Sequence, residues 1–456
     1  MNFVSTILLL LFSQVMIGQS WDNVIENIDT TGTINLIGSS WNNTLIKNCT
    51  IHNTGNGNDG IFLRDVKNVR IENCTIHDID GQGGIRLSIS GNGTDSIVII
   101  NNTLYDLQEN GITAPQRSQN SIPLNQDNLV IEGNTIYNTG LGSSSGLNHA
   151  IYCQAADFKI LNNVVFGIRD GNGISVRSSG LVSGNIVSGE SKDDKPAIRY
   201  FSDHFKGDSD SLIIENNILY NDSSSAHTLD IFDFANLYEN SVSDNHIVKN
   251  FNIRFNTIIS FHSNKYGVRI SQDYDRSSYS TILEGNLIIN TNSLTQCISA
   301  PNRTTQSYNL LQDNLSNFMS DNQPFDFHIS NSHEAINYVG NRSSNFPLDD
   351  VDVELREGNL DAGADEYLMT TGINIIGNGS KHGLFPNPVS IGQPITVESN
   401  QHINSIVLFS SDGKKMFNES LNSKSNTTTL VLPVNQSGIY FMRVNNSQTS
   451  VLFVNN

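Results

Sequence analysis

One short phrase recurs between residues 48 and 288 and constrains the fold of this chain more than any other feature. It is usually Asn or Gly, then Asn, leading directly into a pair of aliphatic or β-branched residues. Its second residue recurs every 22 to 39 residues, at Cys49, Cys74, Asn102, Asn134, Asn163, Asn185, Asn217, Asn256 and Asn286. Repeats of this length predict a solenoid, and their variable spacing predicts loops of different lengths between equivalent units.

A second short strand, often opened by Gly, follows most of these phrases. Apolar and polar residues alternate in it with the period of two that a β-strand requires, and helical periodicity is nearly absent. One apolar residue of each strand is expected to face the interior: Ile61, Ile85, Ile112, Ile151, Ile174, Ile198 and Val268. The residue after each of them then faces outward. The sequence therefore predicts an all-β solenoid.

These repeats resemble the right-handed parallel β-helix of pectate-lyase-like proteins, whose turns carry ladders of Asn side chains. The resemblance covers roughly residues 21 to 300, and it indicates the fold without specifying an activity. Stacked rungs lie ~4.8 Å apart, so Cys49 and Cys74 would be neighbours in one ladder. A disulfide between them is geometrically conceivable. The favoured interpretation is that both replace ladder Asn residues as buried side chains.

The chain divides into four predicted parts. An apolar run at Ile7 to Phe12, followed by small and polar residues, predicts an export signal at residues 1–19. Residues 20–368 contain the β-helix and end in Asp361-Ala362-Gly363-Ala364-Asp365-Glu366-Tyr367, which resembles the terminal phrase of secreted bacterial β-helix proteins. We interpret it as a cap on the open end of the solenoid, with structural carboxylates. Residues 369–383 are rich in Gly, Asn and Ser and predict a linker.

Residues 384–456 carry a different pattern. Their signals are Phe385-Pro386-Asn387-Pro388, the turn Ser411-Asp412-Gly413 and Ser437-Gly438-Ile439-Tyr440. This order resembles the type A C-terminal sorting domain of the type IX secretion system of Bacteroidetes, a small Ig-like β-sandwich. The resemblance implies recognition by that machinery and a secreted or cell-surface location. No membrane span is expected in the mature protein, and we expect a monomer.

The net charge argues against nucleic acid or an anionic membrane as a general partner. Lys and Arg number 26 and Asp and Glu 45, which gives a net charge of −19. Yet five Arg residues fall on two neighbouring outward columns of the second strands. The first column contains Phe62, Arg86, Thr113, Tyr152, Ser175, Arg199 and Arg269, and the second contains Arg64, Ser88, Gln154, Arg177, Phe201 and Ser271.

These columns predict a groove for an acidic polysaccharide. Guanidinium groups bind carboxylate or sulfate in a bidentate manner, and aromatic rings stack on sugars. The expected substrate-binding residues are Arg64, Arg86, Arg269, Phe62 and Phe201.

The favoured activity is that of a lyase cleaving a uronic-acid polymer such as alginate by β-elimination. The reaction needs a neutralised carboxylate, a base for the C5 proton and an acid for the leaving oxygen. We assign Arg177 and Arg199 to the carboxylate, and Lys195, His149 and Tyr152 to proton transfer. Neighbouring Arg residues would lower the pKa of Lys195 and make it a better base. This arrangement resembles the Lys and Arg chemistry of chondroitinase B and alginate lyases, although their full motif is absent.

Three alternatives remain open. The Arg residues could pair with Asp59, Glu109, Asp170 and Asp230 as an ionic surface. A glycoside hydrolase acting on a sulfated or neutral polysaccharide would need paired carboxylates, for which Asp230, Asp233 and Asp170 are candidates. A non-catalytic glycan-binding surface protein is the third possibility. No cofactor is certain; loop Asp residues suggest calcium, and no metal ligand is assigned.

Overall fold

The computed structural model describes two units, one within residues 1–368 and one within residues 369–456. The described residues are 20–88, 90–116, 126–142, 145–189, 194–202, 209–221, 226–232, 247–316, 318, 327–341, 346–356, 358–367, 382–385, 389–399, 402–410, 415–421, 425–435, 438–445 and 449–455. The predicted export signal and residues 369–381 of the predicted linker lie outside them.

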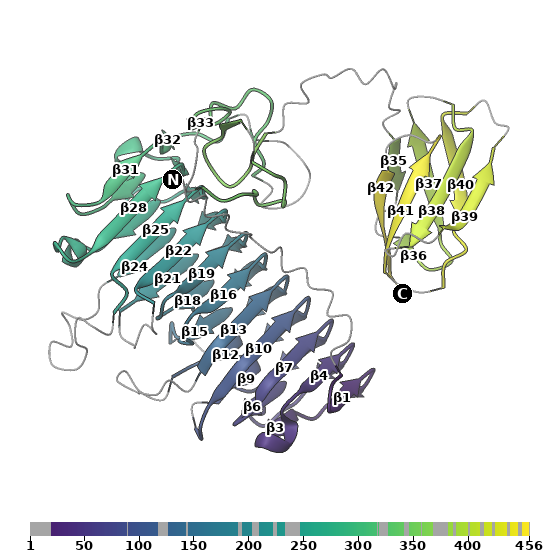
Figure 1. Ribbon diagram of the computed structural model, residues 1–456, viewed down its shortest axis with the longest axis horizontal. Coiled ribbons are helices and arrows are strands. Elements are labelled where there is room, and N and C mark those ends of the chain that lie inside the picture. The colour runs from purple at the N-terminus through teal and green to yellow at the C-terminus, as the bar shows by residue number, and fades with distance from the viewer. Residues whose placement is uncertain are drawn as a thin grey trace, which may run out of the picture. The chain divides into compact units, whose positions relative to one another are not determined.

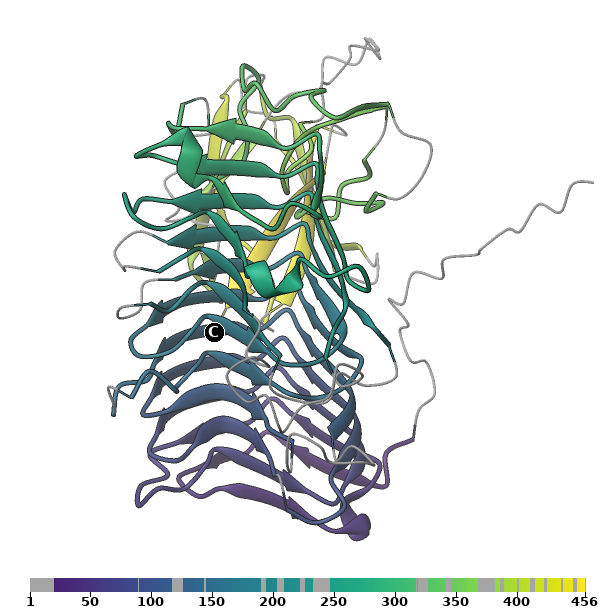
Figure 2. The ribbon, with the colours of Figure 1, turned by 90° about the vertical axis from the view of Figure 1, so that its left-hand side faces the viewer.

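Residues 23–312 wind into a β-helix in which successive turns add one strand to each of three parallel sheets (Figures 1 and 2). The described strands of sheet A are β1 (Asn23–Glu26), β4 (Thr44–Lys47), β7 (Lys67–Glu72), β10 (Thr94–Ile100), β13 (Gln126–Glu132), β16 (Phe158–Leu161), β19 (Gly180–Ser183), β22 (Ser211–Glu215), β25 (Asn250–Arg254), β28 (Ser280–Glu284) and β31 (Thr305–Ser307). Those of sheet B are β2 (Asp29–Thr30), β5 (Thr50–His52), β8 (Thr75–Ile79), β11 (Thr103–Leu107), β14 (Thr135–Thr139), β17 (Val164–Ile168), β20 (Ile186–Ser188), β23 (Ile218–Asn221), β26 (Thr257–Ser260), β29 (Leu287–Asn290) and β32 (Leu310–Gln312).

Sheet C is built from the predicted second strands. Its described members are β3 (Ile34–Ile37), β6 (Ile61–Arg64), β9 (Gly83–Leu87), β12 (Asn110–Ala114), β15 (Ile151–Cys153), β18 (Ile174–Val176), β21 (Ile198–Phe201), β24 (Leu229–Phe232), β27 (Val268–Ile270) and β30 (Ile298–Ser299). The residues expected to face inward, from Ile61 to Val268, are all 0% exposed, which confirms the predicted alternation. They contribute to one apolar core that continues along the solenoid.

Helical structure is confined to short 3₁₀ segments in the part of the chain that the structure describes. These are η1 (Ser39–Trp41), η3 (Gln272–Tyr274) and η4 (Leu294–Gln296). None of the described helices has the length and apolar character needed to cross a bilayer.

A ladder of Asn side chains runs through the turns between sheets A and B. Asn134 Nδ2 donates to Asn163 Oδ1 at 2.9 Å, and Asn163 Nδ2 donates to Asn185 Oδ1 at 2.9 Å. The same amides also donate to main-chain carbonyl groups, so buried polar atoms are satisfied rung after rung. The ladder consists of Asn102, Asn134, Asn163, Asn185, Asn217, Asn256, Asn286 and Asn309.

The backbone explains why the recurring phrase begins with Asn or Gly. The residue before the ladder position has a positive φ, for example 55° at Asn101, 63° at Gly133 and 54° at Asn162. A side chain with a Cβ is strained there, and Gly and Asn tolerate this conformation best. The phrase is therefore selected by backbone geometry at its first position and by hydrogen bonding at its second.

Cys49 and Cys74 occupy the start of the same ladder as free, buried thiols. The Cys74 N–H donates to Asn102 Oδ1 at 2.9 Å, and its thiol lies 3.4 Å from the carbonyl oxygen of Glu72. Burial is the main cause that raises the pKa of the Cys74 thiol to about 12. The structure thus agrees with the interpretation of both residues as buried substitutes for Asn, not with a disulfide.

The segment after the last rung, with β33 (Gly340–Asn341) and β34 (Asn359–Leu360), contacts the side of the solenoid. The Ala364 N–H donates to Thr257 Oγ1 at 3.0 Å, and the Gly363 N–H donates to the Gly285 carbonyl oxygen at 2.8 Å. Thr257 begins β26, and Gly285 precedes β29, so these contacts span two rungs. Ala362 also shares a buried apolar cluster with Leu310 of β32, the last strand of sheet B, so the terminal phrase packs beside the final rungs of this sheet.

The carboxylates of this terminal phrase hold the segment together. Arg356 is fully buried at its side chain and donates from Nη1 to Glu366 Oε2 at 2.9 Å. Asp361 accepts the backbone N–H groups of Asn337 at 2.6 Å and Tyr367 at 2.7 Å. Such bonds offset the cost of burying charge, so these acidic residues have a structural use.

The C-terminal unit contains two described sheets. One consists of β35 (His382–Phe385), β37 (Pro394–Ser399) and β40 (Thr427–Val431), and the other of β36 (Val389–Ser390), β42 (Thr449–Asn455), β41 (Gly438–Val444), β38 (Ser405–Ser410) and β39 (Lys415–Ser420). Ile395 and Val397 of β37 share one buried apolar cluster with Ile406 and Leu408 of β38. The two sheets are thus joined through a common core, as in a β-sandwich.

Candidate active site

Both predicted columns lie on the outward face of sheet C. Strand pairing aligns the first column across successive rungs as Phe62, Arg86, Thr113, Tyr152, Ser175, Arg199, Asp230 and Arg269. Asp230 lies between Arg199 and Arg269 in this column, a position that was not predicted for it from the sequence. The strand signal was present, because Thr228-Leu229-Asp230 follows the apolar and polar alternation of the second strands and lacks only the opening Gly. In the second column, Phe201 pairs with Phe232 of the next strand.

Asp230 binds both of its arginine neighbours. Its carboxylate is 0% exposed and accepts from Arg199 Nε at 2.9 Å and from Arg269 Nε at 2.7 Å. A second bond from Arg269 Nη2, at 2.7 Å, makes that contact bidentate. One buried carboxylate is therefore shared by two guanidinium groups. The alternative in which the Arg residues pair with acidic residues as an ionic surface thus explains part of the column.

Arg86, at the other end of the column, is also engaged by a carboxylate. Its Nε donates to Asp59 Oδ2 at 2.6 Å, and the Gly83 N–H donates to Asp59 Oδ1 at 3.0 Å. The guanidinium carbon lies 4.6 Å from the ring centroid of Phe62. Arg86 thus covers one face of the Phe62 ring, which was predicted to stack on a sugar. Arg64 follows in the second column at the end of β6 and is half-buried.

Arg177 has a different environment. It is 7% exposed, and its Nη1 donates to Ser175 Oγ at 2.8 Å. Its guanidinium carbon lies 4.4 Å from the Phe201 centroid and 5.2 Å from the Tyr152 centroid. These distances are within the range of cation–π attraction, so aromatic rings help to hold the group in place.

Lys195 lies in the turn that leads into β21, beside these arginines. A Cβ added to Gly146, which has φ of +77°, would come 2.7 Å from Lys195 Nζ, so the side chain passes close over this glycine. Burial lowers the pKa of Lys195 from its ordinary value, and the charges of Arg199 and Arg177 lower it further. The amine of Lys195 therefore loses its proton at a lower pH than the amine of an exposed lysine does.

His149 is almost fully buried next to this group, with 4% exposure. Its Nδ1 accepts the Asn172 N–H at 2.8 Å, which leaves the ring proton of the neutral form on Nε2. Burial, followed by the charge of Arg177, holds the pKa of His149 well below its usual range. The ring stacks on Tyr152 with centroids 5.4 Å apart. We refer to His149, Arg177, Lys195 and Arg199 as the Lys195 cluster.

Asp170 supports the turn that carries Gly146. It is 0% exposed and accepts the backbone N–H groups of Gly146 at 2.7 Å and of Leu147 and Asn148 at 3.3 Å. Asp170 and Asp230, two candidates for a hydrolase pair, are thus both engaged in internal contacts. The third candidate, Asp233, lies outside the described residues.

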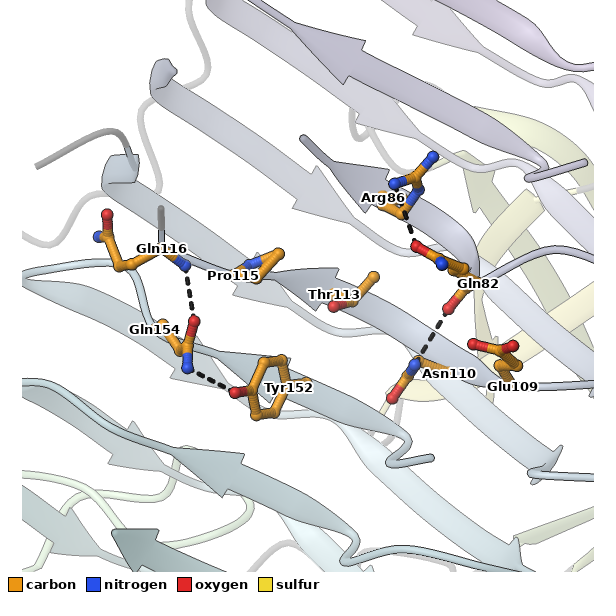
Figure 3. Close-up of a pocket in the computed structure, with 9 residues that line it drawn as sticks. All are labelled: Gln82, Arg86, Glu109, Asn110, Thr113, Pro115, Gln116, Tyr152 and Gln154. Atoms are coloured by element: carbon orange, nitrogen blue, oxygen red, sulfur yellow. Dashed lines mark hydrogen bonds between the residues drawn. The ribbon is translucent and has the colours of Figure 1, made fainter. Parts of the chain in front are cut away.

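A pocket opens on the same face, next to Tyr152 (Figure 3). Its volume is about 330 Å³, which is small for a ligand site. The residues that line it are Gln82, Arg86, Glu109, Asn110, Thr113, Pro115, Gln116, Tyr152 and Gln154.

Hydrogen bonds fix several polar groups of this pocket, as the dashed lines of Figure 3 show. Asn110 Nδ2 donates to the Gln82 carbonyl oxygen at 3.0 Å, and the Gln116 N–H donates to Gln154 Oε1 at 2.6 Å. Gln154 Nε2 in turn donates to the Tyr152 hydroxyl. The lining is therefore rich in amides whose positions are set by their neighbours.

Sequence reasoning did not recognise this pocket. Gln82, Glu109 and Lys195 each stand three residues before an inward isoleucine, at Ile85, Ile112 and Ile198. This common offset places all three at the edge where the chain enters sheet C. Reading a third column at that offset would have aligned Gln82 and Glu109 of the pocket with Lys195.

One group of potential metal ligands occurs among the described residues. His328, Asp352 and Asp365 offer ligand atoms within 4.8 Å of one another. His328 Nε2 lies 2.8 Å from Asp352 Oδ2, so an ion pair already links two of them. They belong to the segment after the last rung, and none of them lines the pocket on sheet C.

Comparisons with known proteins address the fold and the export route. Residues 23–193 match the family described as "right handed beta helix region", and residues 383–453 match the "secretion system C-terminal sorting domain". No curated protein matches the chain. One solved structure, the complex of XylC with xylose, shares 12% identity at a TM-score of 0.35. The match covers 72% of this chain and 65% of that one, just under two thirds of its length.

The sorting domain indicates export to the cell surface or the medium. The chain is a right-handed parallel β-helix protein that carries a type IX secretion sorting domain at its C-terminus.

Proposed function

We propose that the chain is a secreted polysaccharide-degrading enzyme, a lyase that cleaves an acidic, uronic-acid polysaccharide by β-elimination. The observation that carries this proposal is the Lys195 cluster. It brings Arg177, Arg199 and Lys195 together with a neutral histidine beside the outward face of one sheet. Asp170, Asp194 and Asp230 balance part of this charge, and the guanidinium groups supply the donor geometry that binds a carboxylate.

Arg177 and Arg199 are proposed to bind the carboxylate of the uronic acid. A guanidinium group bound to this carboxylate stabilises the charge that develops when the C5 proton leaves. Arg199 also donates to the buried Asp230 at 2.9 Å, and Arg177 is held by Ser175 Oγ at 2.8 Å.

Lys195 is proposed to act as the base. Its lowered pKa gives a larger fraction of neutral amine, which can take the C5 proton. The electron pair of that C–H bond forms the C4–C5 double bond, and the C4–O bond to the next sugar breaks. Tyr152 is proposed to protonate the leaving oxygen, because neutral His149 is a weak acid that serves better as a hydrogen-bond donor.

The test follows ultraviolet absorbance while the purified full chain acts on several polysaccharides. Elimination produces an unsaturated uronate that absorbs, so a rise on a uronic-acid polymer and none on neutral polymers is expected. New reducing ends without any rise would contradict the lyase proposal and indicate hydrolysis. Binding without either signal would indicate a glycan-binding protein.

Glycoside hydrolysis keeps one specific observation in its favour. Glu109 lines the pocket, and burial raises the pKa of its carboxyl group, with Asp59 adding to the shift. A raised pKa is what a general acid in a glycosidase requires. If reducing ends appear without unsaturated product, Glu109→Gln is the first variant to assay.

A further inference from the structure

The charges of the pocket differ from those of the Lys195 cluster. Among the described residues that line the pocket, Arg86 is the one cation, and it is already bound to Asp59 at 2.6 Å. Glu109 adds a second carboxylate. The charge of Arg86 favours the ionised form of Glu109, and the charge of Asp59 disfavours it. Two acidic groups therefore stand against one guanidinium, and a uronate carboxylate entering here would meet net repulsion.

The polar lining has the properties needed to bind hydroxyl groups. Amide side chains from Gln82, Asn110, Gln116 and Gln154 surround the pocket, together with the hydroxyl of Thr113 (Figure 3). An amide both donates and accepts, as a sugar hydroxyl does. Gln116 and Gln154 are almost fully buried and bonded to each other, so the exposed Gln82 and the half-buried Asn110 are the amides placed to bond a neutral sugar. The volume of about 330 Å³ suits a small group, not a long oligosaccharide.

The pocket and the Lys195 cluster meet at Tyr152. This residue lines the pocket, stacks on His149 and lies 5.2 Å beneath the Arg177 guanidinium. Along the first column, Thr113 and Arg199 are three strands apart. At ~4.8 Å per strand this is about 14 Å, so one polymer chain lying along the solenoid can reach both.

We propose that the pocket is a subsite for a neutral, hydroxyl-bearing sugar beside the uronic acid bound at the Lys195 cluster. The preferred substrate is then a heteropolysaccharide in which neutral and acidic sugars are neighbours, not a polymer of uronic acid alone. This inference rests on the proposed function, because it takes the Lys195 cluster as the uronic-acid site.

The test measures binding by calorimetry, separately from cleavage, with the full chain. One probe is an oligosaccharide of alternating glucuronic acid and glucose, and the other is an oligoglucuronic acid of the same length. We expect the alternating probe to bind at least about tenfold more tightly. Its neutral sugar gains a few hydrogen bonds in the pocket and avoids the repulsion that a carboxylate would meet there.

Three variants locate the effect. Thr113→Leu, which fills the pocket, should remove most of this tenfold preference. Glu109→Gln, which keeps the shape and removes a charge, should raise the affinity for oligoglucuronic acid by about threefold. Asn35→Leu, an exposed position in the same column on β3, is the matched control and should change neither affinity.

Equal binding of the two probes, tighter binding of oligoglucuronic acid, or no binding of either would overturn the subsite. So would an equal loss for both probes in Thr113→Leu while Glu109→Gln leaves both affinities unchanged. Cleavage distinguishes this result from failure of the proposed function. If the alternating probe is preferred but yields no unsaturated product, the lyase proposal fails and the subsite stands.

Discussion

Two rows of polar residues run along this solenoid, and they differ in how they are satisfied. In the Asn ladder, each member from Asn102 to Asn286 has the same kind of partner, the amide of the next rung. On the outward face of sheet C, Asp59 holds Arg86, Asp230 holds Arg199 and Arg269, and aromatic rings hold Arg177. Hydrogen bonds to the same partner in every rung make the ladder a structural element. On sheet C the partners differ from rung to rung, so each rung has its own chemistry.

The difference shows what a repeat protein can vary. From Asn102 to Asn309 the ladder keeps one residue type, because each amide is bonded to the amides of the neighbouring rungs. The outer face does not depend on one repeated amide, and the turns that lead into its strands bring residues such as Lys195 beside it. Function is thus expected to concentrate on sheet C, and substitutions in the two rows should have separable effects.

The largest expected effect is on activity, at Lys195. We expect Lys195→Met to lower kcat/KM on a uronic-acid polymer by about 10³-fold, the typical contribution of a general base, with little change in stability. Lys159→Met, at an exposed lysine of β16, is the control and should behave as wild type. Retained activity in Lys195→Met would show that the lysine is not the base. The proposed functional difference between the outward face of sheet C and the Asn ladder would then lose its main support.

The ladder should show the opposite effect. Asn163→Ala removes bonds to Asn134, Asn185 and the Ile131 carbonyl oxygen. Leaving these buried groups unsatisfied should lower the free energy of unfolding by about 4 kcal/mol, measured by urea titration. Asn35→Ala, at an exposed position, should cost less than about 0.5 kcal/mol. Similar losses in both variants would mean that the ladder is not a special source of stability.

A substitution at Arg199 tests whether a residue on the outward face of sheet C can contribute to stability as a ladder residue does. Among the described residues, Arg199→Met leaves the fully buried Asp230 with Arg269 as its ion-pair partner and should cost about 3 kcal/mol of stability. Adding Asp230→Asn removes the buried charge and should recover at least about half of that loss in a double-mutant cycle. Additive losses in the double variant would show that the two residues are not coupled.

The smallest expected effect is a shift in the pH profile. The base must be unprotonated, so kcat/KM should rise with pH as Lys195 loses its proton, below the range of an ordinary lysine. Asp194 raises the pKa of Lys195, so Asp194→Asn should move this rise to lower pH. Asp194 is exposed, and Asn tolerates its φ of 63°, so stability should be unchanged. A shift to higher pH, or none, would contradict the role of Lys195.

Much of the solenoid was predictable because its signals are local and repeated. The positive φ before each ladder position selects Asn or Gly, and the alternation of buried and exposed residues places Ile61 or Ile198 inward whatever the rest of the chain does. The columns on sheet C follow from the same alternation. Thr113, Tyr152 and Arg199 were therefore correctly assigned to one column.

The candidate site was predictable only in its position on that sheet. The column alone did not reveal that Phe62 and Phe201 would be covered by guanidinium groups, or that Asp170 would support a turn. Nor did the sequence show that the terminal phrase would contact Thr257 at the side of the solenoid. These contacts join segments whose separation in the chain varies with loop length.

The sequence by itself determined the fold class, the register of the rungs, the residues that face the core and the export domain. Each of these depends on short-range periodicity or on a local motif. The tertiary structure decided which carboxylate meets which arginine, where Lys195 lies and that amides line a pocket at Tyr152. Those outcomes depend on the paths of non-repeating turns and on burial, because partners such as Arg199 and Asp230 become neighbours only when separate rungs stack.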